Sequence, residues 1–568
     1  MLLPASPHPQ GPSLQVFKWL AIIVVSLILI LFVYPSAFIY PKDTLPDNND
    51  TRLIAYIIGQ AQKNILQGQS LHYGTFFAPD KNTLTYSDLF LTSVIITLPA
   101  RLFTDHPIII FNLALVTHFL LTIIASYLLF GYLLKDHWVT TLAVILFNFS
   151  GYHLHYLPHL QMFSLWPLLL SIYFFIRFQN ENRIVFLNLY FLTVTAQIAE
   201  SIFPVYLIFF ASISLVIARF GTLNQSNPEK PGSPRHIFLA MTKYSLPFLP
   251  VWIFLLFPYF QLHLSLPEAS RPIRDAAHFS LGLDEVFTKY HSWTTILLFL
   301  VSYLSSHGWS QNHYPILKRL RKAKKHGLRL LSEFFAARQD GFAAGQRAIR
   351  FSKRIRMNSD HLAWKIIFFF SLIMSLGPVL KIFGQNFRIF GFPIPLPYAL
   401  FYYLFPGFTG FRTPSRFIVL TLLAAVIIIG FYLKPLFEKL KLKTKFIFIL
   451  LLLSLLLLEA DLPLKGYPVN INTHPVYEQV KALPPEAVIL ELPIKLWNIP
   501  DHEIESIRSL YSLTHNHRRL GGFSGFATKA WIDLVEQINS HGLNQENISI
   551  LKSLGVTHVI ENNTLSPL

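Results

Sequence analysis

Cysteine is absent from this chain of 568 residues, and charged residues are scarce. Without cysteine the protein has no disulfide framework, no thiol nucleophile and no thiolate metal site. Only 14% of the residues are charged, against about 25% in soluble domains, while 52% are hydrophobic. A single apolar core stops growing at about 250–300 residues, so a soluble chain of this composition would leave apolar surface in water. The composition therefore predicts an integral membrane protein.

Acidic residues are also few, because 30 Asp and Glu stand against 47 Lys and Arg. Thirteen of these basic residues fall between Lys318 and Arg356, and most others lie beside apolar runs. Membrane proteins distribute charge in this way, with basic loops on the cytoplasmic side. We therefore expect 307–363 to be a cytoplasmic loop in contact with anionic lipid headgroups. The chain has no nucleic-acid recognition motif, so a nucleic-acid partner is not predicted.

Long apolar runs predict about eleven transmembrane helices, each needing roughly 20 apolar residues. The first run is too long for a signal peptide and reads as a retained helix. With the N-terminus in the cytoplasm and 89–103 on the outer surface, the basic loops fall inside and the C-terminus falls outside. The predicted spans are 17–38, 108–133, 138–157, 162–178, 184–200, 202–219, 244–262, 293–306, 364–383, 416–436 and 446–460.

Two regions follow from this topology. Residues 1–460 form the transmembrane region, with a first outer loop at 39–107. Residues 461–568 change in composition and predict a small extracytoplasmic α/β domain. Within it we expect a buried strand at 487–494, helices at 528–540 and 548–554, and a strand at 555–560.

Carboxylates near the predicted membrane surface are the first candidates for chemistry. Asp47 and Asp50 open the first outer loop, and the residues to about Gln67 have the pattern of an amphipathic helix on the membrane surface. Asp50 is placed at the helix N-terminus, where Asp47 or Asp50 can simply cap the helix. Asp88 and Glu200 lie at the ends of apolar runs, where a carboxylate either binds a polar ligand or serves as a cap.

Histidines and arginines supply the other candidates on the outer side. His153, His155 and His159 follow a Ser-Gly-Tyr turn and are expected to hydrogen-bond a polar ligand. A metal site is a weaker reading, because no nearby carboxylate completes a ligand set.

Four arginines lie in two outer loops, at Arg271 and Arg274 and at Arg412 and Arg416. If a helix begins near Pro414, Arg412 and Arg416 share one face of it. Paired guanidinium groups suit a phosphate or pyrophosphate headgroup, although a simple anchor to phospholipid has the same chemistry.

The order of these pieces resembles the GT-C class of membrane glycosyltransferases, and within it a group of bacterial membrane proteins. The motifs that carry the resemblance extend over nearly the whole chain. They are Phe76-Phe-Ala-Pro79, Tyr86-Ser-Asp88, Ser150-Gly-Tyr-His153-Leu-His155-Tyr-Leu-Pro-His159-Leu-Gln161, Leu376-Gly-Pro378, Pro397-Tyr398, Pro406-Gly-Phe-Thr-Gly-Phe-Arg412-Thr-Pro-Ser-Arg416-Phe417, Leu490-Glu-Leu-Pro493, Gly522-Phe-Ser-Gly525 and Leu554-Gly-Val556.

The resemblance implies a polyprenyl-phosphate-linked sugar as donor and a lipid or glycan acceptor at the outer face of a bacterial plasma membrane. It implies an essential acid in the first outer loop, matched best by Asp50 and next by Asp47, acting as general base. Arg412 and Arg416, with Arg271, would then bind the departing lipid phosphate. No cofactor is implied by the residues, since no second acidic motif supports a divalent cation. A flippase for lipid-linked saccharides, or a helper of envelope-polymer assembly, is the alternative function.

Overall fold

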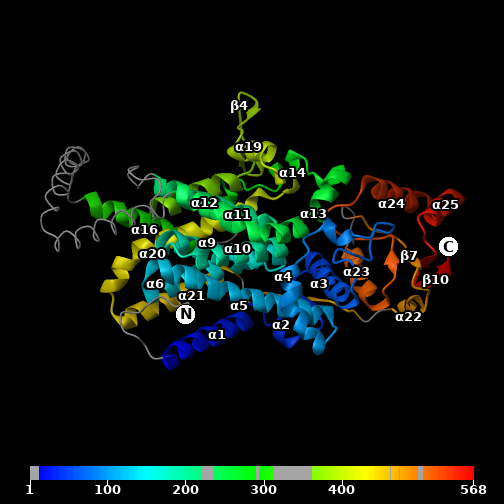
Figure 1. Cartoon of the computed structure of the whole chain (residues 1–568), viewed down its shortest axis with the longest axis horizontal. Helices are drawn as coiled ribbons and strands as arrows, with labels where there is room; N and C mark the ends of the chain where they lie inside the picture. The colour runs from blue at the N-terminus through cyan, green and yellow to red at the C-terminus, as the bar shows by residue number, and fades with distance from the viewer. Residues whose placement is uncertain are drawn as a thin grey trace.

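The structure, a computed structural model, describes residues 12–220, 234–289, 293–311, 361–460, 462, 464–471, 474–496 and 503–568. Most of the predicted cytoplasmic loop at 307–363, including its basic cluster, lies outside the described residues. Figure 1 shows an elongated molecule, with a helical bundle in blue to yellow and the C-terminal elements in orange and red at one end.

Apolar helices build the bundle, and their ends follow local sequence signals. Pro107 begins α5, and Lys135 ends it in the left-handed conformation. Asp136 then caps α6 by accepting a hydrogen bond from the backbone N–H of Val139 at 2.9 Å. The longer helices are α1 (Pro12–Val33), α5 (Pro107–Leu134), α6 (His137–Asn148), α9 (Trp166–Glu181), α10 (Ile184–Glu200), α11 (Phe203–Phe220), α12 (Pro234–Ser245), α13 (Leu249–Ser265), α16 (Trp293–Gln311), His361–Ser375, α20 (Ile418–Lys439) and α21 (Leu442–Glu459).

Four helical stretches among the described residues are long and apolar enough to cross a membrane. They are Pro107–Leu134, Leu160–Glu181, Arg235–Ser265 and Pro414–Lys439, and six shorter apolar helices accompany them. Most residues of Leu160–Glu181 and of Pro414–Lys439 are buried within the protein. Few residues of Arg235–Ser265 are buried, and Phe254, Phe257 and Phe260 on it are exposed. Such an apolar outer surface is expected where lipid is the solvent. The membrane character is supported, and the count of about eleven spans stays a prediction.

A two-stranded sheet fixes the relative sides of the first and last apolar helices. β1 (Thr44–Leu45) pairs antiparallel with β6 (Tyr467–Pro468), and Leu464 N–H donates to the Val33 carbonyl at 2.9 Å. Both helices therefore end on the same side, which requires an even number of crossings between β1 and β6. The predicted topology, with ten spans between them, meets this condition.

Short elements lie between the longer helices. They include α2 (Ser36–Ile39), α3 (Asp50–Gln67), α4 (Leu91–Thr97), α7 (Gly151–His155), α8 (Leu160–Phe163), α14 (Ile273–His278), α15 (Glu285–Thr288), α19 (Pro397–Leu404), the hairpins of β2 (Lys381–Ile382) with β3 (Gln385–Asn386) and of β4 (Arg388–Ile389) with β5 (Phe392–Pro393), and 3₁₀ turns at Thr83–Tyr86, Leu98–Leu102, Leu246–Phe248, Pro267–Ala269, Phe408–Gly410 and Pro414–Phe417.

The C-terminal elements form a four-stranded sheet with helices. The sheet order is β10-β9-β7-β8, in which β7 runs parallel to both β8 and β9. The predicted strands and helices of this region are confirmed, while the boundary at 461 stays a prediction. The elements are α22 (Val476–Lys481), β7 (Val488–Glu491), α23 (Glu503–His515), β8 (Arg518–Arg519), α24 (Lys529–His541), α25 (Gln545–Ser553), β9 (His558–Glu561) and β10 (Thr564–Pro567).

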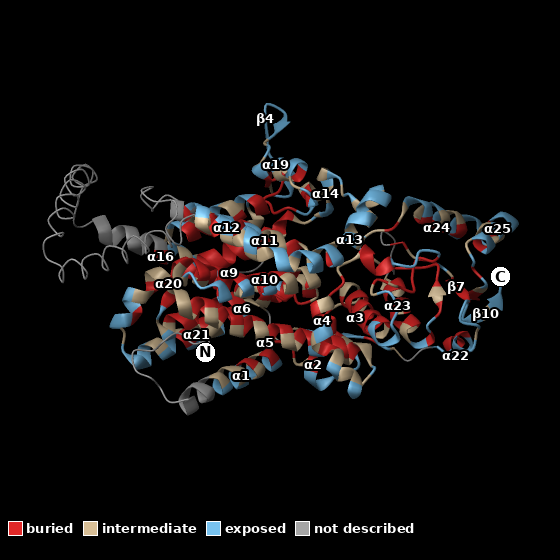
Figure 2. Ribbon diagram, in the orientation of Figure 1, coloured by how far each residue is buried: buried red, intermediate tan, exposed pale blue. Residues whose placement is uncertain are grey.

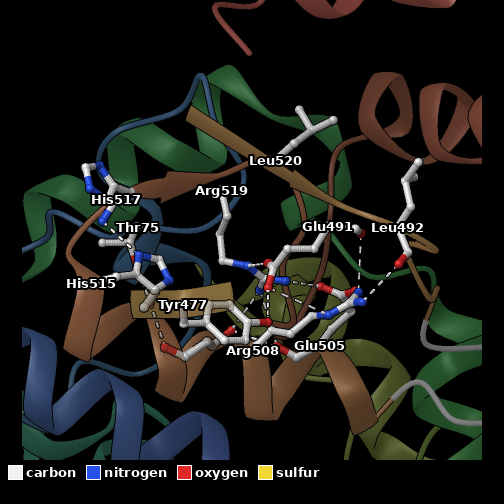
Figure 3. A network of polar contacts seen from close by, with 12 residues as sticks. Thr75, Tyr477, Glu491, Leu492, Glu505, Arg508, His515, His517, Arg519 and Leu520 are labelled. Atoms are coloured by element: carbon white, nitrogen blue, oxygen red, sulfur yellow. Dashed lines mark hydrogen bonds and ion pairs between the residues drawn. The ribbon is translucent and has the colours of Figure 1, made fainter. Parts of the chain in front are cut away.

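A buried network of charges holds β7, β8 and α23 together (Figure 3). Arg519 lies between two carboxylates, with Nε 2.5 Å from Glu491 Oε2 and Nη2 2.6 Å from Glu505 Oε2. Arg508 contacts Glu505 at 2.8 Å, and the Tyr477 hydroxyl donates to Glu491 at 2.6 Å. These charged groups are almost completely removed from solvent, so each one depends on its partners.

The helix α3 corrects the prediction of an amphipathic helix on the membrane surface. It is a helix over the predicted residues, but its central turns are buried on all sides between α5 and α23 (Figure 2). The close approach to α23 occurs at Gly59, where a Cβ atom would lie 2.9 Å from the Leu513 side chain. The polar face of α3 packs on the C-terminal elements, which a helix pattern by itself cannot indicate.

Candidate functional site

Two aspartates at the start of α3 have different environments. Asp47 Oδ1 accepts hydrogen bonds from the N–H groups of Asn49 (3.0 Å) and Thr51 (2.9 Å) and from the Thr51 hydroxyl (2.7 Å). Asp47 therefore satisfies the donors at the helix N-terminus, as a capping carboxylate does. Asp50, the first residue of α3, is left to face other segments of the chain.

The partner of Asp50 comes from the loop after α7. Asp50 Oδ2 lies 3.0 Å from His159 Nδ1, and the two side chains keep 43% and 32% of their surface exposed, so the pair is open to a ligand. Burial opposes ionisation of Asp50, but the neighbouring His159 lowers the pKa of its carboxyl group. The charges of Arg412 and Arg416 lower it further, and the pKa of Asp50 ends below its ordinary value. Asp50 is thus an ionised acceptor at neutral pH.

Arg412 and Arg416 lie on flat aromatic surfaces close to Asp50. The guanidinium of Arg412 lies 5.2 Å from the centre of the Phe279 ring, and that of Arg416 lies 5.6 Å from the Phe203 ring. Burial and the charge of the neighbouring Arg416 lower the pKa of Arg412. The buried Nε of Arg416 has no hydrogen-bond partner within the part of the chain that the structure describes. Two neighbouring cations with an unused donor have the chemistry that an anion site requires.

The backbone conformation that brings Arg412 and Arg416 together differs from the predicted helix. Pro414–Phe417 is a 3₁₀ turn and α20 begins only at Ile418, so Arg412 precedes any helix. The two guanidinium groups therefore do not share a helical face. The irregular backbone between Gly407 and Pro414 brings them together, with Gly407 in the left-handed region at φ +77°.

The second arginine pair is divided by the fold. Arg271 donates from Nη2 to the Gly525 carbonyl and from its backbone N–H to the Thr409 carbonyl, and burial and the charge of Arg412 lower the pKa of Arg271. Arg271 thus joins the arginine cluster to the C-terminal elements. Arg274 keeps 88% of its side chain exposed and contacts Asp275 at 3.9 Å.

Asp88 and Glu200 form an inner layer behind the arginines. Asp88 lies beside Arg416 and Ser201, and burial raises the pKa of its carboxyl group. Glu200 is fully buried at the end of α10 and accepts from the N–H (2.9 Å) and hydroxyl (2.6 Å) of Ser93. Its carboxylate therefore ties α10 to α4, which favours a supporting role over direct contact with a ligand.

The three histidines of the predicted group do not act together. His153 is completely buried, and its Nδ1 and Nε2 lie 3.0 Å from the carbonyl oxygens of Asn148 and Phe163. It holds the loop that carries His159. His155 packs its ring against Tyr156 at 5.3 Å, and only His159 reaches Asp50. Among the residues described, no three His, Asp or Glu side chains are grouped so that they would hold a metal ion.

Sequence reasoning missed several groups around Asp50. Two buried side-chain oxygens, Asn49 Oδ1 and Gln161 Oε1, have no hydrogen-bond partner among the described residues. The rings of Phe279 and Phe203 pack against the guanidinium groups of Arg412 and Arg416, and the carboxylate of Asp275 favours the charged form of Arg412. Gln161 lies two residues after His159, and Asn49 directly precedes Asp50. This closeness in sequence is the signal that could have added both to the candidate residues. Nothing in the local pattern distinguishes the two phenylalanines from the other 50 of the chain's 52.

No protein-family model and no curated protein matches the sequence. Among solved structures, the arabinofuranosyltransferase AftD from Mycobacteria superposes with a TM-score of 0.51 at 13% identity, over 95% of this chain and 35% of that one. This chain therefore shares the fold of the superposed part of that transferase. The chain spans about a third of the length of that transferase, so the likeness concerns the fold alone. The archaeal oligosaccharyltransferase AglB from Archaeoglobus fulgidus, in complex with an inhibitory peptide and a dolichol-phosphate, has a TM-score of 0.43 at 12% identity, over 96% of this chain and 69% of that one.

Proposed function

We propose that this protein is a membrane glycosyltransferase that moves a sugar from a polyprenyl-phosphate donor to an acceptor of the cell envelope. The observation that carries the proposal is an ionised carboxylate, Asp50, paired with His159 beside the cationic pair of Arg412 and Arg416. A base next to an anion site is what transfer from a lipid phosphate to a hydroxyl requires. The proposed setting is a bacterial plasma membrane, with the N-terminus in the cytoplasm and the site and C-terminal elements outside.

In the proposed reaction Asp50 takes the proton of an acceptor hydroxyl as its oxygen attacks the anomeric carbon of the donor sugar. The bond from that carbon to the phosphate oxygen breaks, and its electron pair leaves with the polyprenyl phosphate. Arg412 and Arg416 stabilise the negative charge that develops on the leaving phosphate. Each well-placed donor of this kind is worth about 2.7–4 kcal/mol in an enzyme site.

Donor turnover by the purified protein tests this function. Wild-type protein in lipid nanodiscs would be given a panel of polyprenyl-phosphate sugars together with mixed envelope glycans and lipids as acceptors. Release of polyprenyl phosphate with appearance of a glycosylated acceptor is the expected result. Tight donor binding without release from any member of the panel would favour a carrier of lipid-linked saccharides.

Replacing Arg416 should weaken the use of the donor. The Arg416→Gln variant loses a cation and a donor facing the proposed phosphate, so kcat/KM for the donor is expected to fall about 10- to 100-fold. The matched control is Arg274→Gln, because that side chain is 88% exposed and lies beside Asp275. The measurement is kcat/KM for the donor in both variants. Equal losses in the two would mean that the effect comes from net charge and not from contact with the donor phosphate.

Replacing His159 should move the pH dependence of the reaction. His159 helps to hold the pKa of Asp50 below its ordinary value, and the base form of Asp50 exists above that pKa. In His159→Gln the pKa of Asp50 therefore rises, and the acidic limb of kcat/KM against pH shifts to higher pH. An acidic limb that stays in place while the rate falls would make His159 a contact for substrate alone.

A further inference from the structure

A pocket separate from the Asp50 site lies between the C-terminal elements and two outer segments. It has a volume of about 470 Å³, and its walls come from the first outer loop, the turn after α13, and α24. Three aromatic side chains, Phe77, Tyr86 and Trp531, line it together with two carboxylates, Asp80 and Glu268. Its size is that of a small-molecule site.

The two carboxylates are positioned by the protein and keep hydrogen-bonding capacity. Asp80 Oδ2 accepts from the Tyr86 hydroxyl at 2.6 Å, and Glu268 Oε1 accepts from the Lys529 N–H at 2.9 Å. The second oxygen of each carboxylate has no hydrogen-bond partner among the described residues. No lysine or arginine is among the residues that line the pocket. The pocket thus offers acceptors for hydroxyl groups and repels anions.

A chain of contacts joins this pocket to the arginine cluster. Tyr86, in the pocket wall, stacks on Phe526 with ring centres 4.8 Å apart. The guanidinium of Arg271 lies 5.8 Å from the Phe526 ring, and Arg271 also bonds the neighbouring Gly525 carbonyl. The Arg271 N–H also donates to the carbonyl of Thr409, three residues before Arg412, at 2.8 Å, so one continuous wall leads from the pocket to the segment that carries the proposed phosphate site.

We propose that this pocket binds the acceptor, and that the acceptor is a neutral glycan. Aromatic walls suit the apolar faces of sugar rings, and carboxylate oxygens accept charge-assisted hydrogen bonds from sugar hydroxyls. Two carboxylates without a cation in the lining select against uronic acids and phosphorylated glycans. The proposal rests on the transferase function and names the class of its second substrate.

Binding in the absence of donor tests the pocket independently of turnover. Full-length protein in nanodiscs would be titrated calorimetrically with a neutral hexose tetrasaccharide and with a tetrasaccharide of the same length carrying one uronic acid. We expect the neutral probe to bind, and the acidic probe to bind at least about tenfold more weakly. Asp80→Asn and Glu268→Gln keep the shape of each side chain and should each weaken neutral binding about tenfold.

Two further variants complete the design. Ala530→Leu places a larger side chain at an exposed helix position in the pocket lining, and should abolish binding without loss of folding. Glu536→Gln removes an exposed charge of the same helix outside the lining, and should bind as wild type does. The pocket assignment would be overturned if the neutral probe did not bind, if both probes bound equally, or if Ala530→Leu bound as wild type does. None of these results would bear on donor turnover. Absent turnover with intact binding would instead count against the transferase function.

Discussion

The Asp50→Asn substitution should lower the rate of sugar transfer by about 10²–10⁴, the usual contribution of a positioned general base. Asparagine keeps the shape of the side chain but cannot take a proton from the acceptor hydroxyl. The ionised state of Asp50 is supported by His159, Arg412 and Arg416, so the wild-type carboxylate is ready to act throughout the neutral range. The measurement is release of polyprenyl phosphate by wild type and variant at saturating donor, with thermal stability in detergent recorded for both.

Asp47→Asn is the matched control, since it makes the same chemical change three residues earlier. The Asn oxygen is as good a helix cap as the Asp oxygen, so α3 should keep its stability and Asp50 its position. The transfer rate should stay within about threefold of wild type, since capping differences of this kind are worth a few tenths of a kcal/mol. A collapse of activity in Asp47→Asn with normal activity in Asp50→Asn would exchange the two roles.

The Arg519→Met substitution should destabilise the C-terminal elements by about 3–5 kcal/mol. Arg519 is the shared partner of Glu491 and Glu505, all three are almost fully buried, and Met fills a similar volume without charge. The remaining Arg508 then serves two buried carboxylates alone. Unfolding of the full-length protein, followed by tryptophan fluorescence in denaturant, measures the loss.

The pH dependence of this loss separates a charge effect from a packing effect. The pKa of Glu491 is held below its ordinary value, against burial, by Arg519 and Arg508. Its contribution to stability is therefore complete above the ordinary carboxyl pKa and is lost as the pH falls through the lowered value. The stability difference between wild type and Arg519→Met should accordingly shrink below about pH 4. Arg518→Met, on the same strand, is the control. It should lower the free energy of unfolding by about 0.5–1.5 kcal/mol, because it removes one hydrogen bond to the backbone carbonyl of Asp80. A loss for Arg519→Met that does not change with pH would indicate packing.

The network matters for the site because it anchors the surface against which α3 rests. The Thr75 hydroxyl bonds both Tyr56 of α3 (2.8 Å) and Ser512 of α23 (2.7 Å), and Arg519 N–H donates to the Thr75 carbonyl at 2.7 Å. The C-terminal elements thereby hold the helix whose first residue is Asp50. Loss of the network is expected to reduce activity through the position of α3.

Sequence patterns predicted the classes of element well where the signal is local. The helices from 107 to 220, the strand near 488 and the helices near 529 and 545 follow from apolar runs, caps and turn residues. Local patterns did not predict the environment of a residue where that environment comes from segments far along the chain. Glu200 was a candidate either to bind a polar ligand or to serve as a cap, and His153 was a candidate to hydrogen-bond a ligand. Both are completely buried and bonded to other parts of the chain.

The sequence by itself determined that this chain belongs in a membrane, and it predicted which side its basic loops prefer and which polar residues collect on the other side. These properties depend on composition and on patterns within about twenty residues. Only the tertiary structure decided that Asp50 meets His159 and the charges of Arg412 and Arg416, while Asp47 is used as a cap and Arg274 stays largely exposed beside Asp275. The reason is physical, because residues more than a hundred positions apart are brought together by helix packing and irregular loops, and no local period encodes which of two similar side chains will face them.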